Sequence, residues 1–359
     1  MRVLVTGGCG LIGYHACMYY KNMGHEVVAM DNLERSKLLG HEVSDDRHFF
    51  NKRLLNQAGV ETWLLDVSVR ENWQSILYND VRSKKLRHEQ FDLVIHLAGQ
   101  CGVPTSIANP TRDWEVNANG TLHALEYCRE VGATLCLAST NKVYPIHDDP
   151  KHPTWIKDID NRWRFLDLRY RYGIKEDADF KGARTPYGNS KMAADMLCQE
   201  WSHTYGIRTG VFRMSCIYGP NQFGFEEQGW ATWFVIAAIK NLPITIYGDG
   251  CQVRDMLYVE DCVRAYDAFV SSDRVHGVYN LGGGPGFTLT LNEHLDFLER
   301  RIGRKAKEIT FAEWRPLDQK AYISNITKIQ NELGWTPTIS PEEGLEKVID
   351  WVGKNQEVF

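Results

Sequence analysis

The chain has 359 residues, of which 43% are hydrophobic, so it is long enough to bury a large core and exceeds the usual size of one domain. Its net charge of -5 and its scattered lysines and arginines disfavour a nucleic-acid-binding protein. Nine cysteines, without a CxxC pair, lie mostly in apolar runs and indicate reduced thiols. We expect a soluble cytoplasmic protein with a small-molecule partner and without a membrane span, a targeting signal or bound nucleic acid.

Short apolar runs alternate with helix-length segments along the first part of the chain. The runs cover residues 2–7, 26–31, 61–67, 91–99 and 133–140, and two later ones cover 209–219 and 277–283. This alternation predicts βαβ units and therefore an α/β fold with a doubly wound parallel sheet.

The predicted domains divide near residue 212. We expect a large domain over 1–212 and a smaller substrate-binding lobe over 213–359, with 247–283 partly returning to the large domain. Residues 145–184 interrupt the large domain as a long polar and aromatic insert. Such a segment in a compact protein is usually either functional or flexible.

A glycine-rich turn after the first strand places Gly7, Gly10 and Gly13 at the opening of a helix. This spacing allows a tight turn and close approach to a pyrophosphate, while the helix N-terminus attracts negative charge. Asp31 ends the next strand, 18 positions after Gly13, where a carboxylate bonds the adenosine ribose and repels a 2′-phosphate. We therefore predict a Rossmann-type domain that binds NAD rather than NADP; the alternative is a glycine turn without a ligand. Asp66, after the third strand, either bonds the adenine amino group or caps the strand.

Tyr187 and Lys191 are four residues apart in a segment with a helical pattern. On a helix this spacing places both side chains on one face, so the ammonium lowers the pKa of the phenol and a tyrosinate can act as a general base. A YxxxK match alone is often a solvated helix face. Its position after a dinucleotide-binding motif makes the catalytic interpretation more specific.

These motifs resemble those of the extended short-chain dehydrogenase/reductases that act on nucleotide sugars, a family of NAD-dependent epimerases and dehydratases. The similar segments follow in order along nearly all of the chain: the glycine turn, HLAGQ at 96–100, ASTNKVY at 138–144, Tyr187 with Lys191, FRMSCIYGP at 212–220, and YGDGCQVRDMLYVED at 247–261. Within the family, HLAGQ, STNKVY, GCQVRD and QGWATWF at 228–234 are most similar to the CDP-tyvelose 2-epimerases, also called CDP-paratose 2-epimerases.

The resemblance implies roles for individual residues. Tyr187 is the expected catalytic acid/base, Lys191 its electrostatic partner, and Ser139 or Thr140 the group that bonds the reacting hydroxyl. The implied NAD contacts are Gly7, Gly10, Leu11, Ile12, Gly13, Asp31, Asn32, Asp66, Val67, Leu97, Ala98, Gly99, Gln100, Tyr187, Lys191 and Met214. The implied substrate contacts are Gln100, Thr140, Asn141, Lys142, Cys216, Gln222, Trp230, Arg254 and Arg315. No metal is expected.

Several of these substrate residues have structural alternatives. Arg254 and Arg315 are expected to bind the diphosphate, or else to pair with Asp255 or Asp318. Cys216 stands where many relatives have an asparagine, and either touches the substrate or fills space as a buried thiol.

Aromatic residues also allow more than one interpretation. Those of the insert, Trp155, Trp163, Tyr170 and Tyr172, form either a lid over the sugar or a packing or subunit contact. Trp230 and Trp233, three apart, are core residues or a ligand stack.

Asn141 and Lys142 indicate the type of reaction. Related dehydratases commonly carry acidic residues here to eliminate water, and neither residue can supply that carboxylate pair at neutral pH. We therefore expect an epimerase that inverts carbon 2 of CDP-paratose and CDP-tyvelose through transient oxidation to a 2-keto sugar. The alternatives are a UDP- or GDP-sugar epimerase acting at carbon 4 or carbon 2, such as one for GDP-glucose and GDP-mannose, a net NAD-dependent reductase, and a non-catalytic NAD-binding scaffold. The resemblance also implies a homodimer or homotetramer.

Overall fold

The structure is a computed structural model that describes residues 1–35, 46–78, 90–145, 148–149, 152–303, 307–315 and 317–359. Residues 146–147 and 150–151 of the predicted insert lie outside the described residues. Two compact units are present. The first comprises residues 1–139, 186–212 and 266–278, and the second comprises residues 140–185, 213–265 and 279–359.

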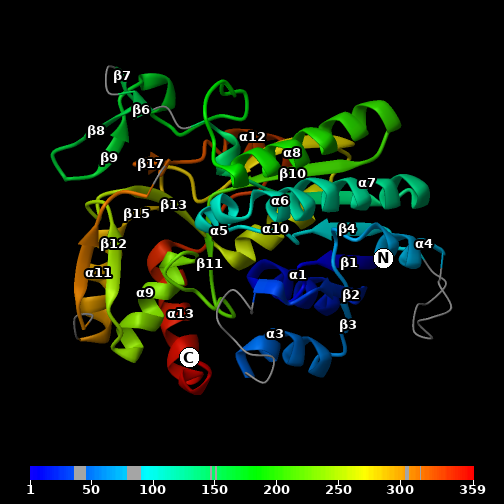
Figure 1. Cartoon of the computed structure of the whole chain (residues 1–359), viewed down its shortest axis with the longest axis horizontal. Coiled ribbons are helices and arrows are strands. Elements are labelled where there is room, and N and C mark those ends of the chain that lie inside the picture. Colours follow the sequence, from blue (N-terminus) through cyan, green and yellow to red (C-terminus); the bar gives the residue numbers. More distant parts are fainter. Residues whose placement is uncertain (36–45, 79–89, 146–147, 150–151, 304–306, 316) are drawn as a thin grey trace. The chain divides into compact units, whose positions relative to one another are not determined.

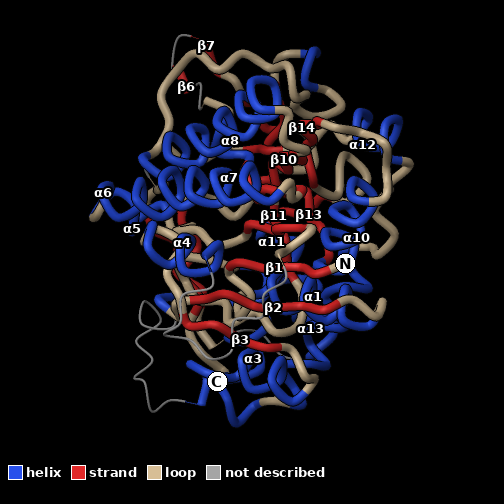
Figure 2. The backbone as a smooth tube through the Cα atoms, turned by 90° about the vertical axis from the view of Figure 1, so that its right-hand side faces the viewer, coloured by secondary structure: helices blue, strands red, loops and turns tan. Residues whose placement is uncertain are grey.

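A seven-stranded sheet with the strand order β14-β10-β5-β4-β1-β2-β3 is the centre of the Rossmann-type fold. Figure 2 shows β1, β2 and β3 side by side at one end of the sheet. The strands are β1 (Arg2–Thr6), β2 (Glu26–Asp31), β3 (Glu61–Leu64), β4 (Leu93–His96), β5 (Thr134–Thr140), β10 (Thr209–Met214) and β14 (His276–Leu281). The predicted doubly wound parallel sheet is confirmed, and its order reverses between β1 and β4, where such sheets bind ligands.

Helices cover this sheet because alternate residues of each buried strand point to opposite faces. Leu4, Val28 and Met30 pack on the face covered by three helices, and those helices contribute buried residues such as Trp73 and Ala194 to the same apolar core. The three are α4 (Arg70–Tyr78), α7 (Gly120–Val131) and α8 (Pro186–Tyr205). The helices α1 (Leu11–Asn22) and α3 (Asp46–Gln57) lie on the other face, as Figure 2 shows.

The apolar run at 209–219 forms two strands. β10 belongs to the seven-stranded sheet, whereas β11 (Cys216–Tyr218) pairs in parallel with β13 (Val253–Tyr258). The break falls at Ser215, whose backbone N–H donates to the carbonyl of Leu281 and whose hydroxyl bonds the Asp255 carboxylate. Ser215 makes these two bonds between the strands, so β10 ends before it and β11 begins after it.

The second unit is built around β13. This strand pairs with β11, with β15 (Thr288–Thr290) and with β17 (Ala321–Tyr322), and a separate pair joins β12 (Ile244–Tyr247) to β16 (Ile309–Ala312). The helix α9 (Trp230–Lys240) packs against α11 (Leu291–Ile302) and α13 (Pro341–Lys354). Among the described residues of both units, the other α-helices are α5 (Val103–Ala108), α6 (Pro110–Trp114), α10 (Val259–Val270) and α12 (Thr327–Leu333), labelled in Figure 1.

The insert contains two short hairpins, β6 (Asp148–Asp149) with β7 (His152–Pro153) and β8 (Trp155–Lys157) with β9 (Trp163–Phe165). Trp155 is buried against Val253 and Ala321 and donates to the Ala321 carbonyl at 3.2 Å. Trp163 donates to the Asp249 carboxylate at 3.0 Å. These two aromatics are therefore packing residues within the second unit. In the part of the chain that the structure describes, no helix is long and apolar enough to span a membrane.

The first prediction concerns Asp255, a fully buried carboxylate on β13 that accepts hydrogen bonds from Ser215, Gly284 and Ser324. Replacing Asp255 with Ala removes the carboxylate acceptor from the Gly284 and Ser324 N–H groups and is expected to lower the free energy of unfolding by about 2–4 kcal/mol. Urea denaturation measures the change. The matched control is Asp296→Ala on the exposed side of α11, expected to change stability by less than about 0.5 kcal/mol. Equal losses of stability in the two variants would contradict the stabilising role of the buried Asp255 carboxylate.

Candidate cofactor and sugar-nucleotide site

The glycine turn places β1, α1 and the end of β4 in direct contact. Gly7 has a φ of +68°, and a Cβ there would lie 2.8 Å from the Ala98 nitrogen. A Cβ on Gly13 would lie 2.1 Å from the carbonyl oxygen of Gly7. Only glycine fits at these two positions without moving backbone, so the turn has the cradle shape expected for a pyrophosphate.

The helix α1 begins at Leu11, followed by Ile12, with Gly10 as its N-cap. Gly10 has no side chain to cap the helix, and the first turn holds no acidic residue. The first N–H groups of α1 therefore have no side-chain acceptor from the cap. A helix N-terminus of this kind favours an anion such as a phosphate.

Asp31 ends β2 next to this turn. Its carboxylate accepts hydrogen bonds from the backbone N–H groups of Cys9 at 2.9 Å and Leu33 at 2.8 Å. Burial raises the pKa of Asp31 above its usual value, and these N–H donors oppose the shift. The glycine turn therefore orients the Asp31 carboxylate, which the sequence predicts to contact the adenosine ribose.

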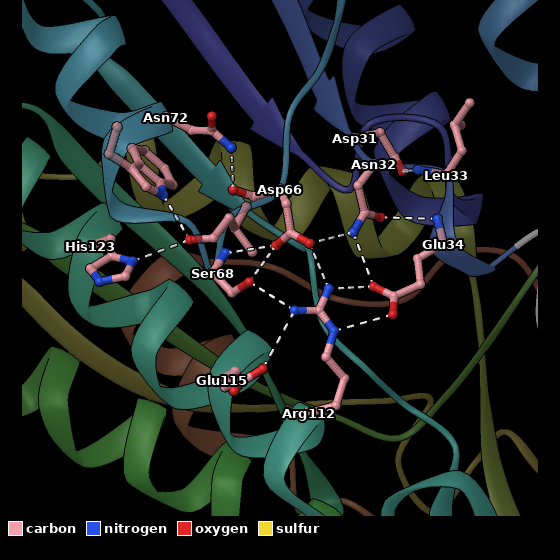
Figure 3. Close-up of polar contacts among 12 residues, drawn as sticks. Asp31, Asn32, Leu33, Glu34, Asp66, Ser68, Asn72, Arg112, Glu115 and His123 are labelled. Carbon is pink, nitrogen blue, oxygen red and sulfur yellow. Dashed lines mark hydrogen bonds and ion pairs between the residues drawn. The ribbon is translucent and has the colours of Figure 1, made fainter. Parts of the chain in front are cut away.

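Asp66 lies in the polar cluster of Figure 3, two residues after β3. Its carboxylate accepts from the N–H and hydroxyl of Ser68 at 2.8 and 2.6 Å, from Asn32 at 2.9 Å, and from Arg112 at 2.5 Å. Partial burial alone would raise the pKa of Asp66, but these donors lower it to about 2. Four bonds occupy a carboxylate fully. An adenine amino group can therefore bond Asp66 only by replacing one of these donors.

The segment after β4 is fixed by buried polar groups. The hydroxyl of Thr6 lies 2.8 Å from His96 Nδ1 and accepts from the N–H groups of Leu97 and Ala98 at 3.2 Å. Burial lowers the pKa of His96 to about 3, so this imidazole is neutral. Val67, the other predicted contact nearby, is buried, and its carbonyl accepts from the Trp73 indole at 2.9 Å.

Tyr187 and Lys191 lie in the first two turns of α8, as the spacing predicts. Lys191 is buried, and burial lowers the pKa of its ammonium group. A Cβ built on Gly99 would lie 3.6 Å from Lys191 Nζ and 2.9 Å from Asn117 Oδ1. Lys191 Nζ and the buried amide oxygen of Asn117 therefore lie next to the side of Gly99 where other residues carry a side chain. The next residue, Gln100, accepts from the Gly102 N–H at 2.5 Å.

A buried polar cluster beside Lys191 was not predicted. The Asn117 amide donates to the Gln100 carbonyl at 3.0 Å and to the Ser190 hydroxyl at 2.9 Å, and that hydroxyl bonds Asp113. Among the described residues, Asp113 Oδ1 and Asn117 Oδ1 have no hydrogen-bond partner. Burial raises the pKa of Asp113. Asn117 lies in a π-helical turn (Glu115–Asn119), a geometry common at functional sites.

The two predicted hydroxyls at the end of β5 differ in their bonding. Ser139 is buried and donates to the Asp195 carboxylate at 2.7 Å. Thr140 accepts from the Lys142 N–H at 3.3 Å, and among the described residues it donates to no acceptor. Thr140 is therefore the hydroxyl that keeps a proton to donate, which favours it over Ser139 for binding a substrate.

In the second unit, Lys142 and Arg254 share one carboxylate. Lys142 Nζ lies 3.1 Å from Gln319 Oε1 and 3.7 Å from Asp318, and Arg254 donates to Asp318 at 2.9 Å. Burial lowers the pKa of Lys142 to about 8. Burial alone would raise the pKa of Asp318, but the two cations hold it below its usual value. Asn141 is buried and, together with Lys142, belongs to a short 3-10 helix (Asn141–Val143) that follows Thr140.

The remaining predicted substrate residues have protein partners in this unit. Arg315 lies over the Tyr247 ring, 4.1 Å from its centroid, and donates to the Glu226 carbonyl at 2.9 Å. Gln222 accepts from Thr232 at 2.5 Å. Burial raises the pKa of Cys216 to about 12, so it is a neutral thiol.

Trp230 and Met214 complete the set of predicted residues. The Trp230 ring packs on the edge of the buried His294 ring, with centroids 5.4 Å apart. The Met214 sulfur lies 4.0 Å from the Cys262 sulfur. All predicted substrate residues except Gln100 lie in the second unit, whereas all predicted cofactor residues except Met214 lie in the first.

Comparisons with known proteins identify the family. The NAD dependent epimerase/dehydratase family matches residues 3–282. The CDP-paratose 2-epimerase of Salmonella typhi is 32% identical over 98% of this chain and 99% of its own length. The solved UDP-glucose 4-epimerase of Thermotoga maritima, with UDP-glucose, has a TM-score of 0.79 at 26% identity and covers 99% of this chain and 100% of its own. The Thermus thermophilus UDP-glucose 4-epimerase, solved with NAD, has a TM-score of 0.74 at 28% identity, with the same coverage.

The expected cofactor, NAD, is confirmed by these comparisons, and the residues of the first unit fit it. The side-chain-free cradle at Gly7 and Gly13 and the uncapped start of α1 suit its pyrophosphate, while Asp31 suits a ribose without a 2′-phosphate. When bound, NAD takes up and gives back a hydride at its nicotinamide ring.

The second prediction tests the cradle. Gly13→Ala places a methyl group against the Gly7 carbonyl and is expected to weaken NAD binding at least about tenfold. Fluorescence titration with NAD measures the affinity. The control is Gly353→Ala in α13, where a Cβ meets no atom within 4 Å. Unchanged NAD affinity in Gly13→Ala would exclude this turn as the pyrophosphate site.

Proposed function

Because this chain belongs to the NAD-dependent epimerase/dehydratase family, we propose that it is a nucleotide-sugar epimerase that inverts carbon 2 of CDP-paratose and CDP-tyvelose. The observation that carries this proposal is the segment after Thr140, where Asn141 and Lys142 provide no carboxylic acid. Elimination of water needs an acid for the leaving hydroxyl, whereas inversion by oxidation and reduction does not. The 32% identity to the CDP-paratose 2-epimerase, over nearly the whole of both chains, supports the choice of substrate.

We assign the proton transfer to Tyr187. Its phenolate accepts the proton of the sugar hydroxyl as carbon 2 loses a hydride, and the phenol returns the proton when the hydride comes back. Lys191, one turn along α8, favours the phenolate through its positive charge. The Thr140 hydroxyl orients the reacting oxygen. The 2-keto sugar must present its other face before reduction, so the nucleotide has to be held while the sugar turns.

Arg254 and Arg315 are the proposed diphosphate contacts. Both guanidinium groups are oriented by protein partners, Arg254 by Asp318 and Arg315 by Tyr247 and Glu226. A guanidinium held in this way can still offer N–H groups to a phosphate oxygen. Neither contact distinguishes one nucleotide base from another.

A second candidate is a UDP-sugar epimerase acting at carbon 4. The observation that favours it is the similarity to the Thermotoga maritima UDP-glucose 4-epimerase, which was solved with UDP-glucose. The proton and hydride chemistry would be the same, so only the substrate distinguishes the two functions.

We also propose a homo-oligomer that pairs through α7 and α8. The two helices pack side by side (Figure 1), and α8 exposes Met196 and Tyr205. Exposed large apolar residues on a helix pair suit a subunit contact.

The third prediction is made with CDP-tyvelose deuterated at carbon 2, incubated with the purified protein without added cofactor. We expect CDP-paratose that keeps the label at carbon 2, because the hydride leaves and returns through the same bound NAD. NMR and mass spectrometry locate the label. No change at carbon 2 would contradict the proposed substrate, and turnover of UDP-glucose instead would favour the second candidate.

The fourth prediction separates Tyr187 from the rest of α8. Tyr187→Phe removes the acid/base while keeping the ring, and is expected to lower kcat at least about 100-fold with little change in NAD affinity. Steady-state kinetics and NAD titration measure the two effects. Tyr205→Phe near the end of the same helix is the control and is expected to keep the wild-type kcat. Retention of activity in Tyr187→Phe would exclude this residue as the acid/base.

A further inference from the structure

Arg112 in α6 is at the centre of the polar cluster in Figure 3. Its Nε donates to Glu34 at 3.1 Å, and its Nη2 donates to Glu34 and to Asp66 at 2.5 Å each. Its Nη1 donates to the Ser68 hydroxyl at 2.8 Å and lies 3.8 Å from a Glu115 carboxylate oxygen. A guanidinium has five N–H donors, and five acceptors surround this one.

The two carboxylates joined by Arg112 come from different strands. Glu34 lies three residues after β2 and Asp66 two residues after β3. The same oxygens that accept from Arg112 Nη2 also accept from the Asn32 amide, at 3.0 Å from Glu34 and 2.9 Å from Asp66. Two carboxylates that share the same two donor nitrogens lie close enough to repel each other, and a cation between them offsets this repulsion.

The ends of β2 and β3 are where a dinucleotide-binding sheet receives the adenosine half of its ligand. Asn32 directly follows Asp31, the proposed ribose contact, and Asp66 is the proposed adenine contact. The segments that hold these residues therefore need a fixed separation before the ligand arrives. Arg112 comes from α6 and belongs to neither segment, so it can set that separation. An adenine amino group that bonds Asp66 would then have to replace one of the other donors, Asn32 or Ser68.

We propose that Arg112 is a positioning residue for the adenosine half of NAD, holding the segments of Glu34 and Asp66 together against the repulsion of their carboxylates. This inference rests on the proposed function, since it takes the ends of β2 and β3 as the adenosine site. Removing the cation drives Glu34 and Asp66 apart and moves Asn32 with them. Neutralising Glu34 as well removes the repulsion between the two carboxylates. The second substitution should therefore restore part of the NAD affinity that the first one loses.

The experiment measures binding of NAD and of ADP-ribose to full-length protein freed of NAD, by calorimetry. ADP-ribose contains the adenosine half and lacks nicotinamide, so it reports on this end of the site. Arg112→Met is expected to weaken both ligands by a similar factor, about tenfold or more. The double variant Arg112→Met with Glu34→Gln is expected to recover most of that loss, while Glu34→Gln alone stays within about threefold of wild type.

The control is Arg70→Met, which removes another arginine paired with a glutamate, at an exposed site on α4. It is expected to leave both affinities unchanged. Thermal unfolding of every variant separates a general loss of stability from a local effect, because a merely structural role of Arg112 would lower the melting temperature without rescue of binding by Glu34→Gln. If Arg112→Met does not fold, Arg112→Lys replaces it. Lysine keeps the charge but cannot reach five acceptors, so an intermediate loss is expected.

Wild-type affinities in Arg112→Met, or a loss that Glu34→Gln does not repair, would overturn the inference while leaving the proposed function intact. Failure of the wild-type protein to bind NAD and ADP-ribose would instead overturn the proposed function, and this inference with it.

Discussion

The absence of a side chain at Gly13 is the constraint on which the cofactor-binding part of the molecule depends. Because α1 lies directly on the Gly7 carbonyl, its first N–H groups reach the carboxyl edge of β1. The same turn lets the Cys9 N–H bond Asp31 at the end of β2, and lets Gly7 touch Ala98 after β4. The contact between Gly13 and the Gly7 carbonyl thus fixes the ends of β1, β2 and β4 relative to one another. It thereby positions the groups proposed to bind the ribose and the pyrophosphate.

Charge pairing is the second organising feature. Arg112 lies between Glu34 and Asp66, and Asp318 lies between Arg254 and Lys142. A diphosphate that reaches Arg254 has to share it with Asp318, which lowers the gain from each contact. The guanidinium is already oriented, however, so less conformational entropy is lost when the ligand binds. An arginine paired in this way binds its ligand less strongly than an unpaired one, but it binds only a ligand whose phosphate groups fit the fixed orientation of the guanidinium.

The sequence predicts those features that depend on periodicity and local spacing. Alternating runs predict the parallel sheet, and the four-residue spacing of Tyr187 and Lys191 places them on one helix. Contacts between distant segments are not accessible in this way: Arg112 and Glu34 are 78 residues apart, and no composition signal marks the π-helical turn that holds Asn117. The partner of Arg254 also needed the structure: Arg254 and Asp255 are neighbours on β13 and point to opposite faces, so Arg254 pairs with Asp318 instead.

The chemistry available after β5 depends on whether a carboxyl group near Lys142 can act as an acid. Asn141 has no dissociable proton in the useful range, and Lys142 is bonded to Gln319 and lies beside Asp318. Asp318 is the carboxyl group closest to this role, yet Arg254 and Lys142 keep its pKa below the usual value, so it is ionised at neutral pH and has no proton to give. Within this cluster of described residues, the leaving hydroxyl of an elimination would find no carboxylic acid. The groups that remain, a threonine hydroxyl and the tyrosine with its lysine, suffice for moving one proton on and off a carbinol oxygen, and that is all that an inversion through a ketone requires.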